Sequence, residues 1–204
     1  MTLNTQDRIY FDTQANRYRR NGRFISQSEM TNIIEARVTQ GFSNLDDLLL
    51  GALDTSTAYT LDDFRLAFAY ELRNLHVQLA IVGGGGTSNM TPQKWGRLGR
   101  LLRDEYAYMN GFIDDIQEGN LSARQVRWRM GQYANKTIGS FWNARTQTAR
   151  DGGLTEERRV LNPAEHCDDC IRLASLGWQP LGTLPDPTFG SVCRSNCRCN
   201  KEYR

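Results

Sequence analysis

The sequence lacks long apolar runs and a recognisable export signal. Its longest apolar stretches, such as the one in LDDLLLGAL, are far shorter than the ~20 residues that a membrane-spanning helix needs. The first residues, MTLNTQDRIYFD, contain no basic segment followed by an apolar core, which is the pattern of a secretory signal. We therefore expect a soluble protein that is made in a cytoplasm.

Lysine is scarce as well. Only Lys94, Lys136 and Lys201 are lysines among the 25 cationic residues, and the rest are arginines. Arginine forms bidentate bonds to carboxylates and phosphates and stacks on aromatic rings, which suits interfaces and nucleic acids. A compositional bias of the source genome would give the same excess. The net charge is only +2 because 23 acidic residues are spread among the arginines, so the composition gives little indication of an extended DNA-binding surface.

Cysteine is absent from residues 1–166, although the chain of 204 residues contains five. A chain of this length buries roughly 70 % of the surface that its unfolded form exposes, so its main body needs no disulfide or metal to fold. The length suits one domain, or one domain with a small appendage. We predict an extended N-terminal arm (1–25), a helical domain (26–150), and a linker with a cysteine-rich tail (151–204).

Apolar residues do not recur at regular intervals in the predicted arm. YFDTQANRYRRNGRF mixes aromatic residues and arginines with Asn and Gly. Such a segment either becomes ordered on a partner or lies along the body of the protein. Its candidate partner-binding residues are Arg17, Arg19, Arg20 and Arg23.

Residues 26–150 carry apolar side chains at intervals of three and four, which is typical of amphipathic helices. The strongest stripe comprises Trp95, Leu98, Leu102, Tyr106, Met109, Phe112, Ile113 and Ile116. A later stripe, expected to form one helix, comprises Val126, Met130, Tyr133, Ile138, Phe141 and Trp142. Helix starts are indicated by Thr60 with Asp63, by Thr91 before Pro92, and by Ser122 with Gln125. The predicted fold class is mainly α, either a helical bundle or an extended helical array.

Three features of this helical part have both a structural and a functional interpretation. The four glycines at 83–86 follow a helix rather than a strand, so we interpret them as a flexible linker rather than a phosphate-binding loop. His76 lies in an amphipathic helix, and we expect it on the helix surface or at the edge of the core. Arg124, Arg127 and Arg129 form a solvated face most simply, with an acidic partner or phosphates as the alternative.

The five cysteines form two clusters, Cys167 with Cys170, and Cys193 with Cys197 and Cys199. Two thiolate clusters separated by a loop are the typical arrangement of a closed tetrahedral zinc site. The loop GWQPLGTLPDPTFG is rich in Gly and Pro, so a bound metal would supply folding free energy that this segment lacks. We predict a small irregular subdomain with a structural Zn²⁺. The spacing leaves open which four cysteines bind the ion, and His166 is a reserve ligand.

Other uses of the cysteines fit the sequence less well. Disulfides are disfavoured by the odd number of cysteines and by the expected cytoplasmic origin. A redox C-x-x-C would open a helix in a thioredoxin-like sheet, and no strand–helix alternation precedes this one. Catalysis by a Cys/His pair is disfavoured because His166 directly precedes Cys167, and neighbouring side chains seldom face each other. We therefore expect a protein that is not an enzyme.

The segment EERRVLNPAEHCDDCIRLASLGWQPLGTLPDP…VCRSNCRCNKEYR resembles the C-terminal part of tailed-bacteriophage head morphogenesis proteins, the minor head proteins related to the F protein of phage Mu. Those proteins have a C-x2-C, a Pro-containing loop and an NCRC end. RYRRNGRFIS and GGGG…WGRLGRLLRDEYAYMNGFIDDI are also similar to such head-gene products. The resemblance covers most of the chain, and the cysteine tail is its specific part.

The resemblance implies zinc-knuckle roles for Cys167, Cys170, Cys197 and Cys199. Cys193 matches a variant of the pattern. Many family members carry a histidine just before the NCRC element, where this chain has Arg194. That departure leaves the fourth ligand open.

The resemblance also implies a virion component of the head or head–tail junction, assembled in the host cytoplasm. Its partners would be portal, capsid or neck proteins, and several copies would be present in the virion. The alternative is a zinc-containing nucleic-acid-binding protein, in which Arg194 and Arg198 contact phage DNA beside the arginines of the arm. Phosphate binding would weaken steeply with salt, whereas contacts between subunits would survive moderate salt.

Overall fold

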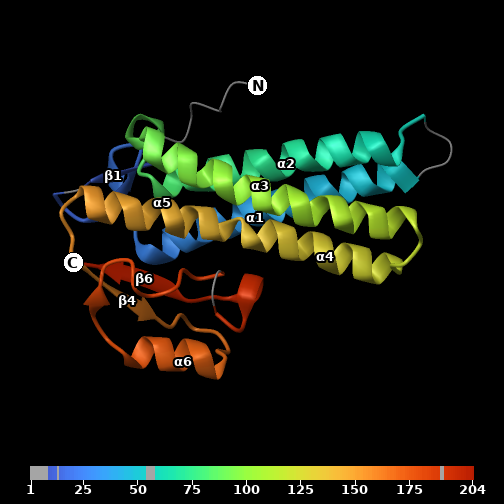
Figure 1. Cartoon of the computed structure of the whole chain (residues 1–204). Coiled ribbons are helices and arrows are strands. Elements are labelled where there is room, and N and C mark those ends of the chain that lie inside the picture. The colour runs from blue at the N-terminus through green and yellow to red at the C-terminus, as the bar shows by residue number, and fades with distance from the viewer. Residues whose placement is uncertain (1–8, 13, 54–57, 189–190) are drawn as a thin grey trace.

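The computed structural model describes residues 9–12, 14–53, 58–188 and 191–204. Its main body consists of long helices that lie side by side (Figure 1), which confirms the mainly α fold class. These helices are α1 (Gln27–Leu53), α2 (Leu61–Gly83), α3 (Pro92–Gln117), α4 (Ala123–Lys136) and α5 (Ile138–Asp151). Within the described ranges, no helix combines the length and the apolar character of a membrane span.

Clusters of buried apolar side chains hold the helices together, and the two largest of those described involve all five helices. One lies among α1, α2, α3 and α4 and is built on Phe64, Phe68 and Phe112. The other joins α1, α2 and α5, where Leu75 and Leu79 pack near Phe141. Most of the predicted stripe on α3 is buried. Trp95, in the first turn of that helix, is an exception because 39 % of its surface is exposed.

The predicted helix starts are confirmed. The Thr60 side chain accepts a hydrogen bond from the Asp63 backbone N–H, and the Asp63 carboxylate accepts from the Thr60 N–H. Ser122 and Gln125 make the same reciprocal pair at the start of α4. At the start of α3, the Thr91 side chain accepts from the Lys94 N–H, and Pro92 follows the cap. These contacts satisfy backbone donors that a helix leaves unpaired at its first turn.

The prediction of one helix across residues 126–142 was wrong. Thr137 separates α4 from α5, and its hydroxyl donates to the Ala134 carbonyl at 2.6 Å. The two helices still follow each other along the bundle (Figure 1). An apolar stripe does not reveal such a break, because its period continues through Ile138 and Phe141.

The prediction for His76 was also wrong. Its side chain is fully buried where α5 packs on α2, and Nδ1 lies 2.7 Å from the Ser140 hydroxyl. Burial, aided by the nearby charge of Lys136, lowers the pKa of His76 to about 3. The histidine is therefore a neutral core residue.

Residues 9–12 and 14–24 contain the three strands of a small sheet, which corrects the predicted extended arm; residues 1–8 and 13 lie outside the described residues. The strands β1 (Ile9–Asp12), β2 (Arg17–Arg20) and β3 (Arg23–Phe24) pair antiparallel in that order. Ile9, Phe11 and Tyr18 are buried against the helical core. The sheet forms because these alternate residues share one face and because Asn21-Gly22 supplies a tight turn with positive φ at both positions.

The glycines at 83–86 do not form a linker, which corrects that prediction. Gly83 is the last residue of α2, and a Cβ added there would lie 2.1 Å from the Phe141 carbonyl oxygen. Gly85 has a φ of +83°, and its carbonyl accepts a hydrogen bond from the Phe11 N–H at 3.4 Å. The run is needed because α2, α5 and β1 approach one another closely here, and only glycine leaves room for the contact.

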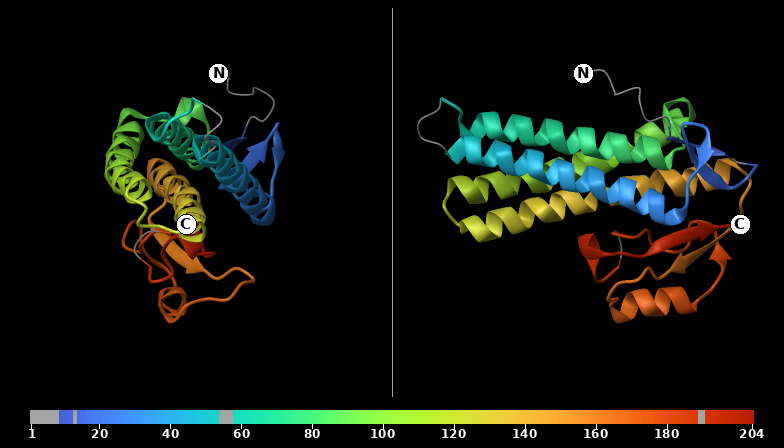
Figure 2. Two further views of the ribbon diagram at one scale, coloured as in Figure 1. Left: turned by 90° about the vertical axis from the view of Figure 1, so that its right-hand side faces the viewer. Right: turned by 180° about the vertical axis from the view of Figure 1, so that it is seen from behind.

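The C-terminal part is a second small sheet with a helix, so the predicted irregular subdomain is also corrected. Its elements are β4 (Glu156–Val160), α6 (Asp168–Ser175), β5 (Gln179–Pro180), the short 3-10 helix η2 (Arg194–Asn196) and β6 (Asn200–Tyr203). The strands are antiparallel in the order β5-β4-β6. Both views in Figure 2 show this sheet between α6 and the helical bundle.

Candidate metal centre

The cysteines lie at or near the ends of short helices and of a strand in the C-terminal part. Cys167 is the N-cap of α6, and Cys170 lies in the first turn of that helix. Cys193 and Cys197 flank η2, and Cys199 directly precedes β6. The Asp169 carboxylate accepts a hydrogen bond from the Val192 N–H at 3.3 Å, which holds the two chain segments together. The fold thus brings both sequence clusters to one place, as the spacing predicts.

The distances between sulfur atoms are those of metal ligands rather than of disulfides. The Cys170 sulfur lies 3.3 Å from that of Cys193 and 3.8 Å from that of Cys197. A disulfide requires about 2.05 Å, and all five thiols are free. Four sulfurs bound to one ion at ~2.3 Å are separated by ~3.8 Å along the edges of the tetrahedron. The geometry therefore fits a thiolate-bound ion.

In each of two overlapping groups of side chains, the ligand atoms lie within 4.8 Å of one another. The first consists of Cys167, Cys170 and Cys193, and the second of His166, Cys170 and Cys199. Cys170 belongs to both groups and is almost fully buried. A metal ion bound here would therefore have Cys170 as its central protein ligand.

His166 is oriented for binding. Its Nε2 lies 2.7 Å from the Asn162 carbonyl oxygen, and its Nδ1 lies 3.6 Å from the Cys199 sulfur. A carbonyl oxygen only accepts hydrogen bonds, so Nε2 carries the proton and Nδ1 presents a lone pair to the cluster. A histidine that donates to a carbonyl through one nitrogen while facing a metal site with the other is typical of metal-ligating histidines.

The surroundings favour a negative charge on Cys197. Hydrogen bonds from the Cys199 thiol and from the backbone amides of Cys199 and Thr188, with the charge of Arg159, lower the pKa of Cys197 to about 4. Burial raises the pKa of Cys170. The hydrogen bond to Cys197, together with burial, raises the pKa of Cys199. A thiolate is the form that binds metal ions, so Cys197 is prepared to act as a ligand.

The arginines of the predicted arm are partly used within their own sheet. Arg19 pairs with Asp12 at 2.9 Å and stacks on the Phe24 ring, with its guanidinium carbon 3.6 Å from the ring centroid. Arg17 lies over the same ring at 4.7 Å. Arg23 lies 3.8 Å from Glu29. Arg20, the fourth candidate, lies at the end of β2.

The other candidate arginines are distributed over the surface. Arg194 and Arg198 are exposed, and Arg198 lies 3.6 Å from Glu35. Arg127 and Arg129 pair with carboxylates of neighbouring helices, at 2.7 Å and 2.6 Å, respectively. The structure therefore does not gather the predicted arginines into one patch with the cysteines.

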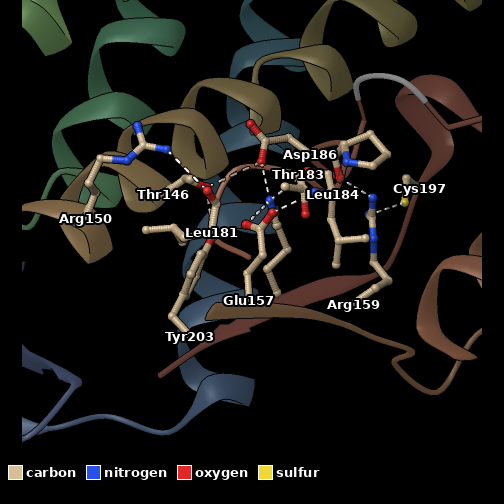
Figure 3. Close-up of polar contacts among 12 residues, drawn as sticks. Thr146, Arg150, Glu157, Arg159, Leu181, Thr183, Leu184, Asp186, Cys197 and Tyr203 are labelled. Atoms are coloured by element: carbon tan, nitrogen blue, oxygen red, sulfur yellow. Dashed lines mark hydrogen bonds and ion pairs between the residues drawn. The ribbon is translucent and has the colours of Figure 1, made fainter. Parts of the chain in front are cut away.

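A charged layer that the sequence did not predict lies between the C-terminal sheet and α5 (Figure 3). Glu157 and Arg159 of β4 alternate along the strand, and Lys201 and Tyr203 lie opposite them on β6. All four are buried. Glu157 and Arg159 alternate with half-buried neighbours on β4. The sequence does not indicate their burial, because charged side chains are usually solvated. Because its charged side chains are buried together, this layer is a second candidate for a reactive site.

A cationic residue also connects the two small sheets. The Arg145 guanidinium of α5 lies over the rings of Phe11 and Tyr203, with its central carbon 3.8 Å and 4.7 Å from their centroids. Arg145 donates to the Asn16 side-chain oxygen at 3.2 Å. The aromatic rings of both sheets thus stabilise one buried cation from α5.

Comparisons with known protein families, with curated proteins and with solved structures found no match. The cysteine and histidine cluster is therefore characterised by the distances, burial and hydrogen bonds of its own side chains. The chain is a mainly α-helical protein whose C-terminal sheet carries a cluster of cysteine and histidine side chains that can hold a metal ion.

Proposed function

We propose that the protein is a structural component of a tailed-phage virion, in the head or at the head–tail junction, and that a structural Zn²⁺ stabilises its C-terminal sheet. The observation that carries the metal assignment is the convergence of the two cysteine clusters at sulfur–sulfur distances of 3.3 Å and 3.8 Å. The virion assignment is supported by the resemblance of the cysteine tail to that of minor head proteins.

Zinc suits the donor set. Soft thiolates select zinc over hard cations such as Mg²⁺ and Ca²⁺, and four of them complete its preferred tetrahedron. We assign the ligands as Cys167, Cys170, Cys193 and Cys197, because the first three form one group and the Cys197 sulfur lies 3.8 Å from that of Cys170. Cys199 then remains with His166. When bound, the ion would supply folding free energy to the sheet.

A structural role is supported by what surrounds the cluster. Three apolar side chains of the same region are at least 46 % exposed: Ile171, Leu176 and Val192. Exposed apolar residues close to a rigid site are suited to contacts with a neighbouring protein. The metal would hold this surface in one shape, and the helices would give it a rigid base.

The contacts of the arginines favour this role over nucleic-acid binding. Arg19 is committed to Asp12 and Phe24, and Arg198 lies near Glu35. Arginines that already pair with carboxylates offer less to phosphates than free ones do. The assembly role is therefore the function proposed here.

Three measurements test the proposal. Elemental analysis of the purified chain should find one zinc per molecule, and its absence would contradict the metal assignment. Mass spectrometry of particles from the source phage should detect this chain in tail-bearing heads, and absence from the particles would contradict the virion assignment. Binding to duplex DNA that falls by orders of magnitude between about 0.05 and 0.2 M salt would favour the nucleic-acid alternative.

A further inference from the structure

Three charged groups of the buried layer meet at one nitrogen atom. The Lys201 Nζ lies 2.6 Å from a Glu157 carboxylate oxygen and 2.9 Å from a carboxylate oxygen of Asp186. The side chains of Lys201 and Glu157 are at most 1 % exposed, and that of Asp186 is 19 % exposed. Figure 3 shows Glu157 and Asp186 directed toward each other from β4 and from the loop that precedes the second cysteine cluster.

The arrangement is costly as a set of ion pairs. Glu157 and Lys201 carry charges in a place that excludes water, and desolvation of charged groups opposes folding. The same arrangement is favourable for condensation. An amine and a carboxylate held in contact react as if at very high concentration, and exclusion of water favours the amide over its hydrolysis.

We propose that Lys201 and Asp186 form an intramolecular amide bond, with Glu157 as the group that transfers protons. Glu157 accepts a proton from the Lys201 ammonium and passes it to the Asp186 carboxyl group. The free amine of Lys201 then attacks the carboxyl carbon, and Nζ forms a bond to that carbon.

The atoms balance without any oxidant or other reactant. The nitrogen gives up a second proton through Glu157 to the departing hydroxyl group, which leaves as water. The C–O bond of Asp186 breaks, the C–N bond replaces it, and Glu157 returns to its starting carboxylate. One ammonium and one carboxylate are thus converted into one amide and one water.

The neighbours hold the three groups in place. The Leu184 N–H donates to the other oxygen of Glu157 at 2.8 Å, and the Leu184 carbonyl accepts from Lys201 Nζ at 3.1 Å. The Thr146 hydroxyl of α5 lies 3.4 Å from the Asp186 oxygen. Positioning of a reacting pair by fixed hydrogen bonds is what raises its effective concentration.

The two neighbouring prolines limit the other reactions by which Asp186 could lose water. Asp186 stands between Pro185 and Pro187, which restrict its backbone. The common loss of water at aspartate requires attack by the N–H of the next residue, and Pro187 has none. Lys201 is therefore the nitrogen available to Asp186 among the contacts of this layer.

The bond would close a covalent loop from residue 186 to residue 201, which contains three of the five cysteines. It would tie β6 to the loop that precedes the second cysteine cluster, independently of any ion. A test of the bond is thus separable from a test of the metal, because the bond persists when the metal is removed.

Intact mass spectrometry of the full chain, denatured with reductant and chelator, tests the proposal. We expect a mass lower than that of the sequence by one water molecule. Proteolysis should release a branched peptide that joins the segments around Asp186 and Lys201, with no tryptic cleavage after Lys201. A wild-type mass equal to that of the sequence would overturn the proposal.

Three variants sharpen the test. Lys201→Arg keeps the positive charge but should show the full sequence mass; persistence of the water loss in this variant would overturn the proposal. Glu157→Gln should also show the full mass while retaining its helical circular dichroism, and complete bond formation in it would overturn the role of Glu157. Lys136→Arg alters a different ion pair, with the buried Glu105, and should still lose one water.

Discussion

Arg159 and Cys197 form a buried contact in which the guanidinium Nη1 donates to the sulfur at 3.7 Å. Arg159 is 2 % exposed and projects from the face of β4 that is turned to the bundle. A permanent positive charge beside a sulfur atom stabilises the thiolate over the thiol. The contact therefore links the charged layer to the metal centre.

Replacing Arg159 should weaken metal retention in acid. In Arg159→Leu the thiolate of Cys197 loses a stabilising charge, so its pKa rises from about 4. Protons then compete with the metal at a higher pH. A chromogenic chelator should register half-release of zinc at a higher pH than in the wild type. Arg158→Leu removes a neighbouring arginine that pairs with Glu202 at 2.6 Å and should leave the release curve unchanged.

Removal of the metal should loosen the C-terminal sheet and spare the helices. Cys170→Ser, or a strong chelator, should unfold residues 160–204, because short strands and one short helix bury little apolar surface on their own. Far-UV circular dichroism should retain most of its helical signal, while hydrogen exchange accelerates after residue 160. A large loss of helical signal would show that the bundle depends on the metal.

The fourth ligand can be identified by a matched pair of variants. If Cys193 binds the ion and Cys199 does not, Cys193→Ser should lower zinc affinity far more than Cys199→Ser. The physical reason is that a hydroxyl is a poor substitute for a thiolate on zinc. Competition with a calibrated chelator measures both affinities. The opposite order would support the ligand set that the resemblance implies.

Gly83 should not tolerate a side chain. In Gly83→Ala the new Cβ would meet the Phe141 carbonyl oxygen at 2.1 Å, so α2 and α5 must separate at a cost of about 1–3 kcal/mol or more. Gly99→Ala on α3 meets nothing within 4 Å and should stabilise by up to about 1 kcal/mol. Urea denaturation compares the two variants, and equal free energies of unfolding would contradict the close contact.

Acid should destabilise the protein through His76. The unfolded chain protonates this histidine near its ordinary pKa of 6.5, whereas the folded chain resists until about pH 3. The unfolded state therefore binds more protons in this window, and the free energy of unfolding falls as the pH drops from 6.5 toward 3. The slope from this one group reaches about 1.4 kcal/mol per pH unit. In His76→Gln, urea denaturation at several pH values should show a smaller slope.

The helices and the convergence of the cysteines were predictable because their signals are local. Thr60 and Asp63 cap a helix through contacts within one turn, and a single turn brings the sulfurs of Cys167 and Cys170 together. The N-terminal sheet was missed because its strands are short. The turn at Asn21-Gly22 and the apolar alternation of Ile9 and Phe11 were its only signals.

The charged layer was not predictable by the same means. Glu157, Asp186 and Lys201 come from separate segments of the C-terminal part. Each is a charged residue of a type that usually lies at the surface. Only the packing of the sheet on α5 buries them together. The break at Thr137 likewise depends on how α5 meets α2, which the apolar period does not encode.

The turn between β1 and β2 is joined directly to β6, and α5 connects β1 to the same strand. The Asn16 side chain donates to the Tyr203 carbonyl at 3.0 Å, and Arg145 lies between Phe11 and Tyr203. Asn16 and Tyr203 are separated by 187 positions in the sequence. The N-terminal sheet therefore completes these contacts only after β6 has been synthesised, so its final packing depends on a segment that is made much later.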